Sequence, residues 1–160
     1  MANIFSPQEM LRIAIRVEAN GVQLYATLES RAHSPGAKAV WAYLKEQDEL
    51  HRMIFQDMLN QMGDFVPSDT YPGEYDAYIN ALAAEYVFMP DLISRRISGG
   101  FATDQEAVDF GILIEKESIG TYTALKRYLL AVKQPVLDKI IEEEKGHLVK
   151  LVELKLSLIK

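Results

Sequence analysis

The stretch Glu143-Glu144-Lys145-Gly146-His147 decides the fold of this chain, because it places a carboxylate three residues before a histidine. Asp48-Glu49-Leu50-His51 has the same spacing 96 residues earlier. In an α-helix, residues three apart lie within one turn, about 60° apart around the axis and ~4.5 Å along it. Each carboxylate can therefore reach the same ion as its histidine.

A glutamate precedes each of these pairs at nearly the same distance. Glu18 lies 30 residues before Asp48, and Glu115 lies 29 residues before Glu144. The chain has three histidines, and this pattern uses two of them. Four carboxylates and two imidazoles that point inward from four helices form the ligand set of a carboxylate-bridged di-metal centre. The predicted metal ligands are Glu18, Asp48, His51, Glu115, Glu144 and His147.

Capping signals and breaks divide the chain into four long helices. Ser6-Pro7-Gln8-Glu9 and Thr103-Asp104-Gln105-Glu106 are capping boxes, and Ser34-Pro35-Gly36 and Gln134-Pro135 are breaks between helices. The predicted helices cover about 7–31, 36–62, 104–132 and 135–158. The residues from about 63 to 103, which contain several prolines and glycines, are predicted to form a long crossover with one or two short helices.

The two halves of the chain repeat one another. The first helix maps onto the third at an offset of 97, so that Tyr25 matches Tyr122, and the second maps onto the fourth at an offset of 96. One helical hairpin cannot bury its apolar stripe alone, so two must pair. The sequence predicts a single all-α domain over residues 1–160, a four-helix bundle of two duplicated hairpins.

Composition limits the class of protein further. The 160 residues carry a formal charge of −6, which gives no reason to expect a nucleic-acid partner. No cysteine is present, which excludes disulfides and thiolate metal sites and is typical of a reducing compartment. Neither a signal peptide nor an apolar run long enough to span a membrane is recognisable. We expect a cytoplasmic protein that does not act at a membrane.

The ligand types indicate which metal the site takes. Carboxylate and imidazole ligands without sulfur favour iron or manganese, and the sequence does not choose between them. Four carboxylates balance two divalent ions, and they balance two trivalent ions with one oxo bridge equally well. Tyr25 and Tyr122, each seven residues after a predicted glutamate ligand, are expected to pack beside the ligands and to hydrogen-bond to them. Glu143 and its neighbours Glu142 and Lys145 are expected on a solvated face.

These motifs resemble the rubrerythrin-like branch of the ferritin-like superfamily over essentially the whole chain. The resemblance rests on Glu18-x-x-Gly21-x-x-x-Tyr25, on Glu115-Lys116-Glu117-Ser118 and on Glu142-Glu143-Glu144-Lys145-Gly146-His147. It implies a di-iron centre in which Glu18 and Glu115 are terminal or bridging ligands, Asp48 and Glu144 bridge, and His51 and His147 each bind one metal. It also implies a reaction with hydrogen peroxide or dioxygen.

Three departures from that family affect the expected chemistry. Asp48 stands where glutamate is usual, and Ile112 stands where full-length rubrerythrins carry a further glutamate ligand. The four-cysteine rubredoxin domain that supplies electrons in those proteins is not in this sequence. Electrons would therefore come from an external donor, rubredoxin-like or another reductase, and the active form is expected to be a homodimer.

Three functions fit the sequence. The first is a di-iron oxidoreductase that reduces peroxide or reacts with dioxygen. The second is a ferroxidase that feeds iron storage or delivery. In the third, the protein is not an enzyme, and the metal pair only holds the bundle together.

Overall fold

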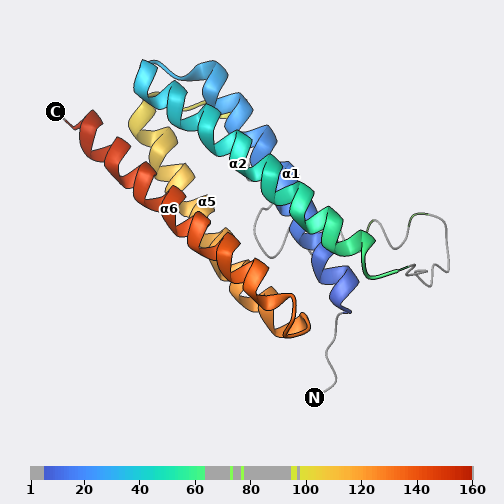
Figure 1. Cartoon of the computed structure of the whole chain (residues 1–160). Coiled ribbons are helices and arrows are strands. Elements are labelled where there is room, and N and C mark those ends of the chain that lie inside the picture. The colour runs from blue at the N-terminus through green and yellow to red at the C-terminus, as the bar shows by residue number, and fades with distance from the viewer. Residues whose placement is uncertain (1–5, 64–72, 74–76, 78–94, 97, 160) are drawn as a thin grey trace.

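The computed structural model of this chain describes residues 6–63, 73, 77, 95–96 and 98–159, the side chain of Tyr128 excepted. This part contains four long helices, and Figure 1 shows them as two hairpins lying side by side. The predicted all-α four-helix bundle is confirmed. The helices are α1 (Pro7–Arg31), α2 (Pro35–Asn60), α5 (Asp104–Leu125) and α6 (Gln134–Leu158).

Capping side chains begin three of these helices. Ser6 Oγ accepts from the Glu9 amide at 3.1 Å and Glu9 bonds back to the Ser6 amide, which completes the predicted capping box of α1. Ser34 caps α2, with Pro35 in the first turn. Thr103 caps α5 as predicted, but the reciprocal bond differs, because the Glu106 carboxylate accepts from the amide of Ala102 instead.

The third helix is shorter than the sequence predicted. We expected it to reach about residue 132, whereas α5 ends at Leu125 and continues only as a 3-10 turn, η1 (Lys126–Tyr128). The Gln134 side chain donates to the carbonyl of Leu129 at 3.2 Å, within this connection. The Gln134 amide thus satisfies a backbone carbonyl that has no helical N–H partner after the helix ends. The chain then enters α6.

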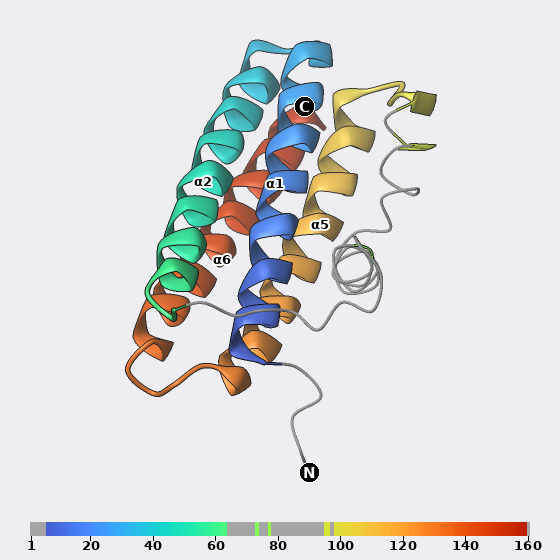
Figure 2. The same ribbon diagram turned by 90° about the vertical axis from the view of Figure 1, so that its right-hand side faces the viewer.

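Each helix of the bundle is antiparallel to its neighbours. In Figure 2, α1 lies between α2 and α5, with α6 behind, and α2 ends at the end of the bundle where α1 begins. Residues 61–103 therefore connect opposite ends of the bundle, as a long crossover must. The short helices predicted for this segment lie almost entirely outside the described residues.

An ionic contact ties the two hairpins together where α5 begins. The buried Asp104 carboxylate accepts hydrogen bonds from the backbone amides of His33 and Ser34, at 2.9 and 2.8 Å. Burial alone would raise the pKa of Asp104, but these hydrogen bonds lower it, and the net shift is downward. The His33 side chain is 68% exposed.

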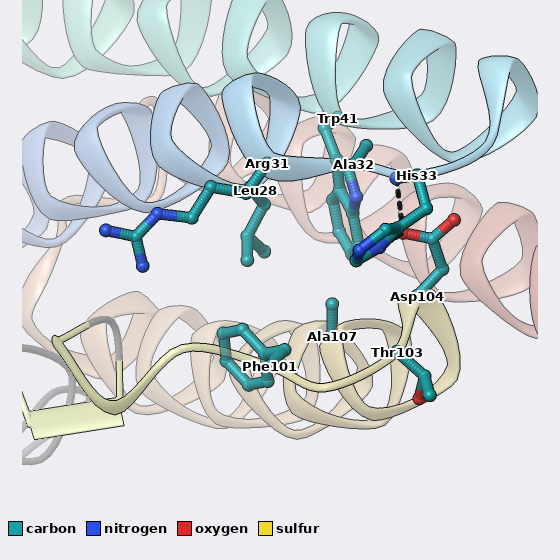
Figure 3. Close-up of a pocket in the computed structure, with 9 residues that line it drawn as sticks. All are labelled: Leu28, Arg31, Ala32, His33, Trp41, Phe101, Thr103, Asp104 and Ala107. Carbon is teal, nitrogen blue, oxygen red and sulfur yellow. Dashed lines mark hydrogen bonds and ion pairs between the residues drawn. The ribbon is translucent and has the colours of Figure 1, made fainter.

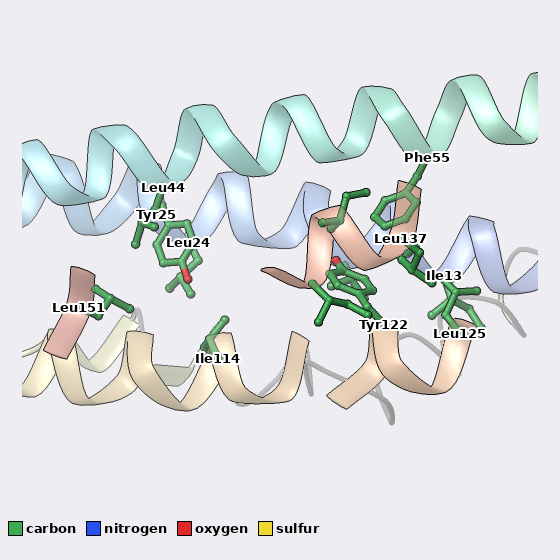
Figure 4. Close-up of a cluster of buried hydrophobic side chains, with 14 of the residues drawn as sticks. Ile13, Leu24, Tyr25, Leu44, Phe55, Ile114, Tyr122, Leu125, Leu137 and Leu151 are labelled. Atoms are coloured by element: carbon green, nitrogen blue, oxygen red, sulfur yellow. The ribbon is translucent and has the colours of Figure 1, made fainter. Parts of the chain in front are cut away.

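The core follows the predicted stripes and their duplication. The predicted pairs that are buried include Leu11 with Val108, Tyr25 with Tyr122, and Leu44 with Ile140. Ile15 and its counterpart Ile112 are both only partly buried. Figure 4 shows buried side chains in two groups along the bundle, one around Tyr25 and one around Tyr122. The predicted ligands occupy the positions between these groups on each helix.

Candidate metal centre

The six side chains predicted as ligands come together in the interior of the bundle. All six are buried, and Asp48 is the most exposed of them at 6%. They form two groups whose ligand atoms lie within 4.8 Å of one another. The first group is Glu18, Asp48, His51 and Glu144, and the second is Glu115, Glu144 and His147.

Glu144 belongs to both groups and lies between the two histidines. Its Oε1 is 2.7 Å from His51 Nδ1, and its Oε2 is 3.3 Å from His147 Nδ1. Two carboxylate oxygens directed at two different imidazoles are the arrangement of a carboxylate that bridges two ions. The two imidazole rings stack, with centroids 5.7 Å apart.

Two atoms of the first group have no hydrogen-bond partner in the described part of the chain. His51 Nδ1 and Glu144 Oε1 are both buried without one, although they lie close together. Glu18 Oε1 lies 3.7 Å from the same nitrogen. Buried polar atoms are nearly always hydrogen-bonded, and donor atoms that approach a common point without bonding each other are arranged as ligands are. The residues fit a metal ion.

Two tyrosines hold the glutamates, but across helices rather than along them. Tyr25 of α1 donates to Glu115 of α5 at 2.5 Å, and Tyr122 of α5 donates to Glu18 of α1. The sequence placed each tyrosine beside the glutamate of its own helix. Because α1 and α5 are antiparallel neighbours, each phenol instead reaches the partner helix.

Gly21 makes room for Asp48. A Cβ at Gly21 would lie 2.0 Å from Asp48 Oδ2, so any larger residue would displace the carboxylate. The Asp48 side chain occupies the space beside Gly21 that a Cβ would fill. Asp48 belongs to the first group only. It is one methylene shorter than glutamate, and its bridging role stays a prediction.

Glu143 is partly exposed and also contacts a predicted ligand. We expected it on a solvated face, but its Oε2 lies 3.0 Å from His51 Nε2. Glu143 precedes Glu144, and a rotation of about 100° per residue turns it toward the neighbouring helix. That neighbour is α2, which carries His51. The pairing of α2 with α6 was the signal that would have found this contact.

The cluster holds more negative charge than a dry interior tolerates. Burial, followed by repulsion from neighbouring carboxylates, raises the pKa of Glu18 and Asp48 well above its usual value. Burial and Glu144 raise the pKa of Glu115 to about 8. Burial opposes ionisation of Glu144 as well, but the side chains of His147 and His51 beside it outweigh this effect and lower its pKa. Bound cations would relieve this repulsion between buried carboxylates.

A separate hollow lies near the Asp104 contact. It is lined by residues that include Leu28, Trp41, Phe101 and Asp104, and Figure 3 shows these side chains between α1 and the start of α5. None of the six predicted ligands lines it. Trp41 connects it to the site indirectly, because its ring stacks on Tyr25 at a centroid distance of 5.7 Å.

A four-helix bundle with a buried carboxylate on each helix and a buried histidine on α2 and on α6 defines the class of ferritin-like di-iron carboxylate proteins. Comparison with known proteins agrees. The family model Rubrerythrin matches residues 9–155, and the chain belongs to the rubrerythrin family.

A solved structure shares this fold. It is a ferritin-like diiron-carboxylate protein from Thermotoga maritima, with 27% sequence identity and a TM-score of 0.68. The match covers 94% of this chain and 95% of that one. No curated protein matches the sequence. None of the described helices has the length and apolar character that a membrane span requires.

Proposed function

We propose that this protein is a di-iron oxidoreductase of rubrerythrin type that reduces hydrogen peroxide with electrons from an external donor. One observation carries the proposal: six buried donor side chains from four helices converge in two groups that share Glu144. The predicted ligands Glu18, Asp48, His51, Glu115, Glu144 and His147 would hold two iron ions there. Manganese, or a mixed pair, fits the same oxygen and nitrogen donors.

The bound metal pair would supply two electrons, one from each ion. Peroxide reduction consumes two electrons and two protons and yields two molecules of water. An external donor would resupply these electrons. A rubredoxin-like protein is the kind of donor we propose, acting on a homodimer.

The chain's own residues keep the site ordered and dry. Tyr25 and Tyr122 donate hydrogen bonds to Glu115 and Glu18, which fixes the orientation of both carboxylates. Figure 4 shows apolar side chains in two groups along the bundle, and the predicted ligands lie between these groups in the sequence of each helix. These apolar groups exclude bulk water, so charges in the site interact strongly.

Peroxide consumption by iron-loaded protein tests this proposal. We expect turnover with a reduced rubredoxin as donor, at a rate above that of the same concentration of free iron. A Glu144→Ala variant is the matched control, because it removes the carboxylate common to both groups. Turnover equal to that of free iron, or unaffected by Glu144→Ala, would contradict the proposal.

Two further measurements separate the other functions that the sequence permits. Gel filtration and iron loading test for storage, since a dimer that saturates at two iron ions per chain does not store iron. An optical spectrum that responds to neither peroxide nor dithionite would identify a metal pair that only stabilises the bundle.

A further inference from the structure

The two groups of donors are unequal, although the halves of the chain are duplicated. The group at His51 has three carboxylates, Glu18, Asp48 and Glu144, whereas the group at His147 has two, Glu115 and Glu144. A divalent ion at the first position would therefore meet one more negative charge and one more donor. This difference concerns the number of ligands alone.

A second difference lies behind the histidines. His51 directs Nδ1 at the carboxylates and Nε2 at Glu143, whose Oε2 is 3.0 Å away. When Nδ1 binds a metal, the ring proton is on Nε2, and this N–H donates a hydrogen bond to Glu143. A carboxylate in this position fixes the tautomer and the orientation of the ring and makes its other nitrogen a stronger ligand.

His147 has no such support in the described residues. Its Nδ1 also faces the carboxylates, but its Nε2 is buried without a hydrogen-bond partner. The offset of 96 that relates α2 to α6 matches Glu143 with Gln47, which is neutral. The edge-on ring of Tyr43 lies near His147, with centroids 5.9 Å apart. The support of His51 by a carboxylate is therefore confined to one half.

From these two differences we infer that the metal positions fill in order, and that Glu143 is a positioning residue for the first. The position at His51 binds its ion first and more tightly, and the position at His147 fills second. This inference rests on the proposed metal pair. The inference goes beyond the presence of a metal pair, because a duplicated site with equivalent halves would bind its two ions in no fixed order.

Titration of the metal-free protein with Co²⁺ as the probe tests this order. Co²⁺ is not oxidised by air during such a titration, and its visible absorption reports the ligands of each ion. For the unaltered chain we expect two resolved steps of one equivalent each, with the first at least tenfold tighter. His147→Ala should keep the tight step and lose the weak one. His51→Ala should lose the tight step and keep the weak one.

Variants of Glu143 test its role directly. Glu143→Ala removes the acceptor, and we expect the first step to weaken by about 10- to 100-fold while the second is unchanged. Glu143→Gln keeps a hydrogen-bond acceptor without the charge, and the affinity of its first step should lie between those of the unaltered chain and Glu143→Ala. Glu142→Ala is the matched control, since Glu142 is the preceding residue on α6, is 70% exposed and pairs with Lys145.

A spectroscopic signature distinguishes positioning from a general structural effect. In the Co²⁺ form, the Nε2 proton of His51 should give a paramagnetically shifted NMR signal that exchanges slowly with water. Exchange should accelerate in Glu143→Ala and stay slow in Glu142→Ala. Glu143 is 36% exposed, so its replacement leaves the core packing intact, which far-UV circular dichroism verifies.

The outcomes separate this inference from the proposed function. If the unaltered chain binds two Co²⁺ ions in one unresolved step, or if Glu143→Ala leaves the first step unchanged, the inference is wrong and the metal pair stands. If it binds no Co²⁺ at all, the metal centre itself is wrong.

Discussion

Replacing Gly21 with alanine tests whether the close contact between α1 and Asp48 positions a metal ligand. Gly21 lies inside α1, and the new Cβ would be 2.0 Å from Asp48 Oδ2 and 3.1 Å from its Cγ. Nonbonded atoms of this kind are at their optimum at about 3.5 Å or more. The carboxylate oxygen must therefore move by roughly 1 Å or more, which removes it from the first donor group.

The size of the effect differs between the metal-free and metal-bound forms. Replacing a glycine by alanine within a helix stabilises it by about 0.5–1 kcal/mol. Forcing one side chain away from its preferred rotamer costs about 0.5–1.5 kcal/mol. The two changes nearly cancel, so we expect the unfolding free energy of the metal-free Gly21→Ala protein to stay within about 1 kcal/mol of the unaltered value. Metal binding at the His51 position should weaken by tenfold or more.

Thermal unfolding of the metal-free protein and Co²⁺ titration measure the two effects. Gly120→Ala is the control, because Gly120 lies within α5 and a Cβ added there would meet no atom within 4 Å. It should raise stability by about 0.5–1 kcal/mol and leave metal binding unchanged. If Gly21→Ala binds Co²⁺ as tightly as the unaltered chain, Asp48 is not a ligand at the position described.

Three further results are expected. Tyr122→Phe leaves the buried Glu18 carboxylate without its donor, so the unfolding free energy should fall by about 1–3 kcal/mol; an unchanged melting temperature would contradict this. Asp104→Asn should destabilise the protein at pH 6. Backbone hydrogen bonds stabilise the ionised Asp104 carboxylate and outweigh the effect of burial, so the pKa of Asp104 is lowered in the folded protein. The stabilisation by ionised Asp104 is present above pH ~4 and is lost as the pH falls through the lower, folded pKa, so urea unfolding should show the variant approaching the unaltered chain at acidic pH. Free Mn²⁺ at 100 times its dissociation constant should raise the unfolding free energy by ~2.7 kcal/mol, and an equal rise in Glu144→Ala would place the ion elsewhere.

The positions of the predicted ligands could be derived from the sequence because helical spacing is regular. A carboxylate three residues before a histidine must share its face, and the constant offsets between halves require that whole hairpins are duplicated. Those two facts place Glu144 and His147 opposite Asp48 and His51, as the structure has them.

The features that could not be predicted from the sequence depend on contacts between helices. The phenol of Tyr122 reaches Glu18 rather than Glu115 because α1 and α5 are antiparallel neighbours, which no spacing within one helix determines. Glu143 approaches His51 for the same reason. The early end of α5 at Leu125 depends on a side chain nine residues further along, at Gln134.

The most direct test of the metal centre is the stoichiometry of Fe²⁺ binding to metal-free protein under anaerobic conditions, measured after removal of free ion. Two ions per chain are predicted, with a lower content in Glu144→Ala, since that carboxylate is the one both donor groups share. Fewer than two ions in the unaltered chain, or the same content in both proteins, would contradict a di-iron centre at these residues.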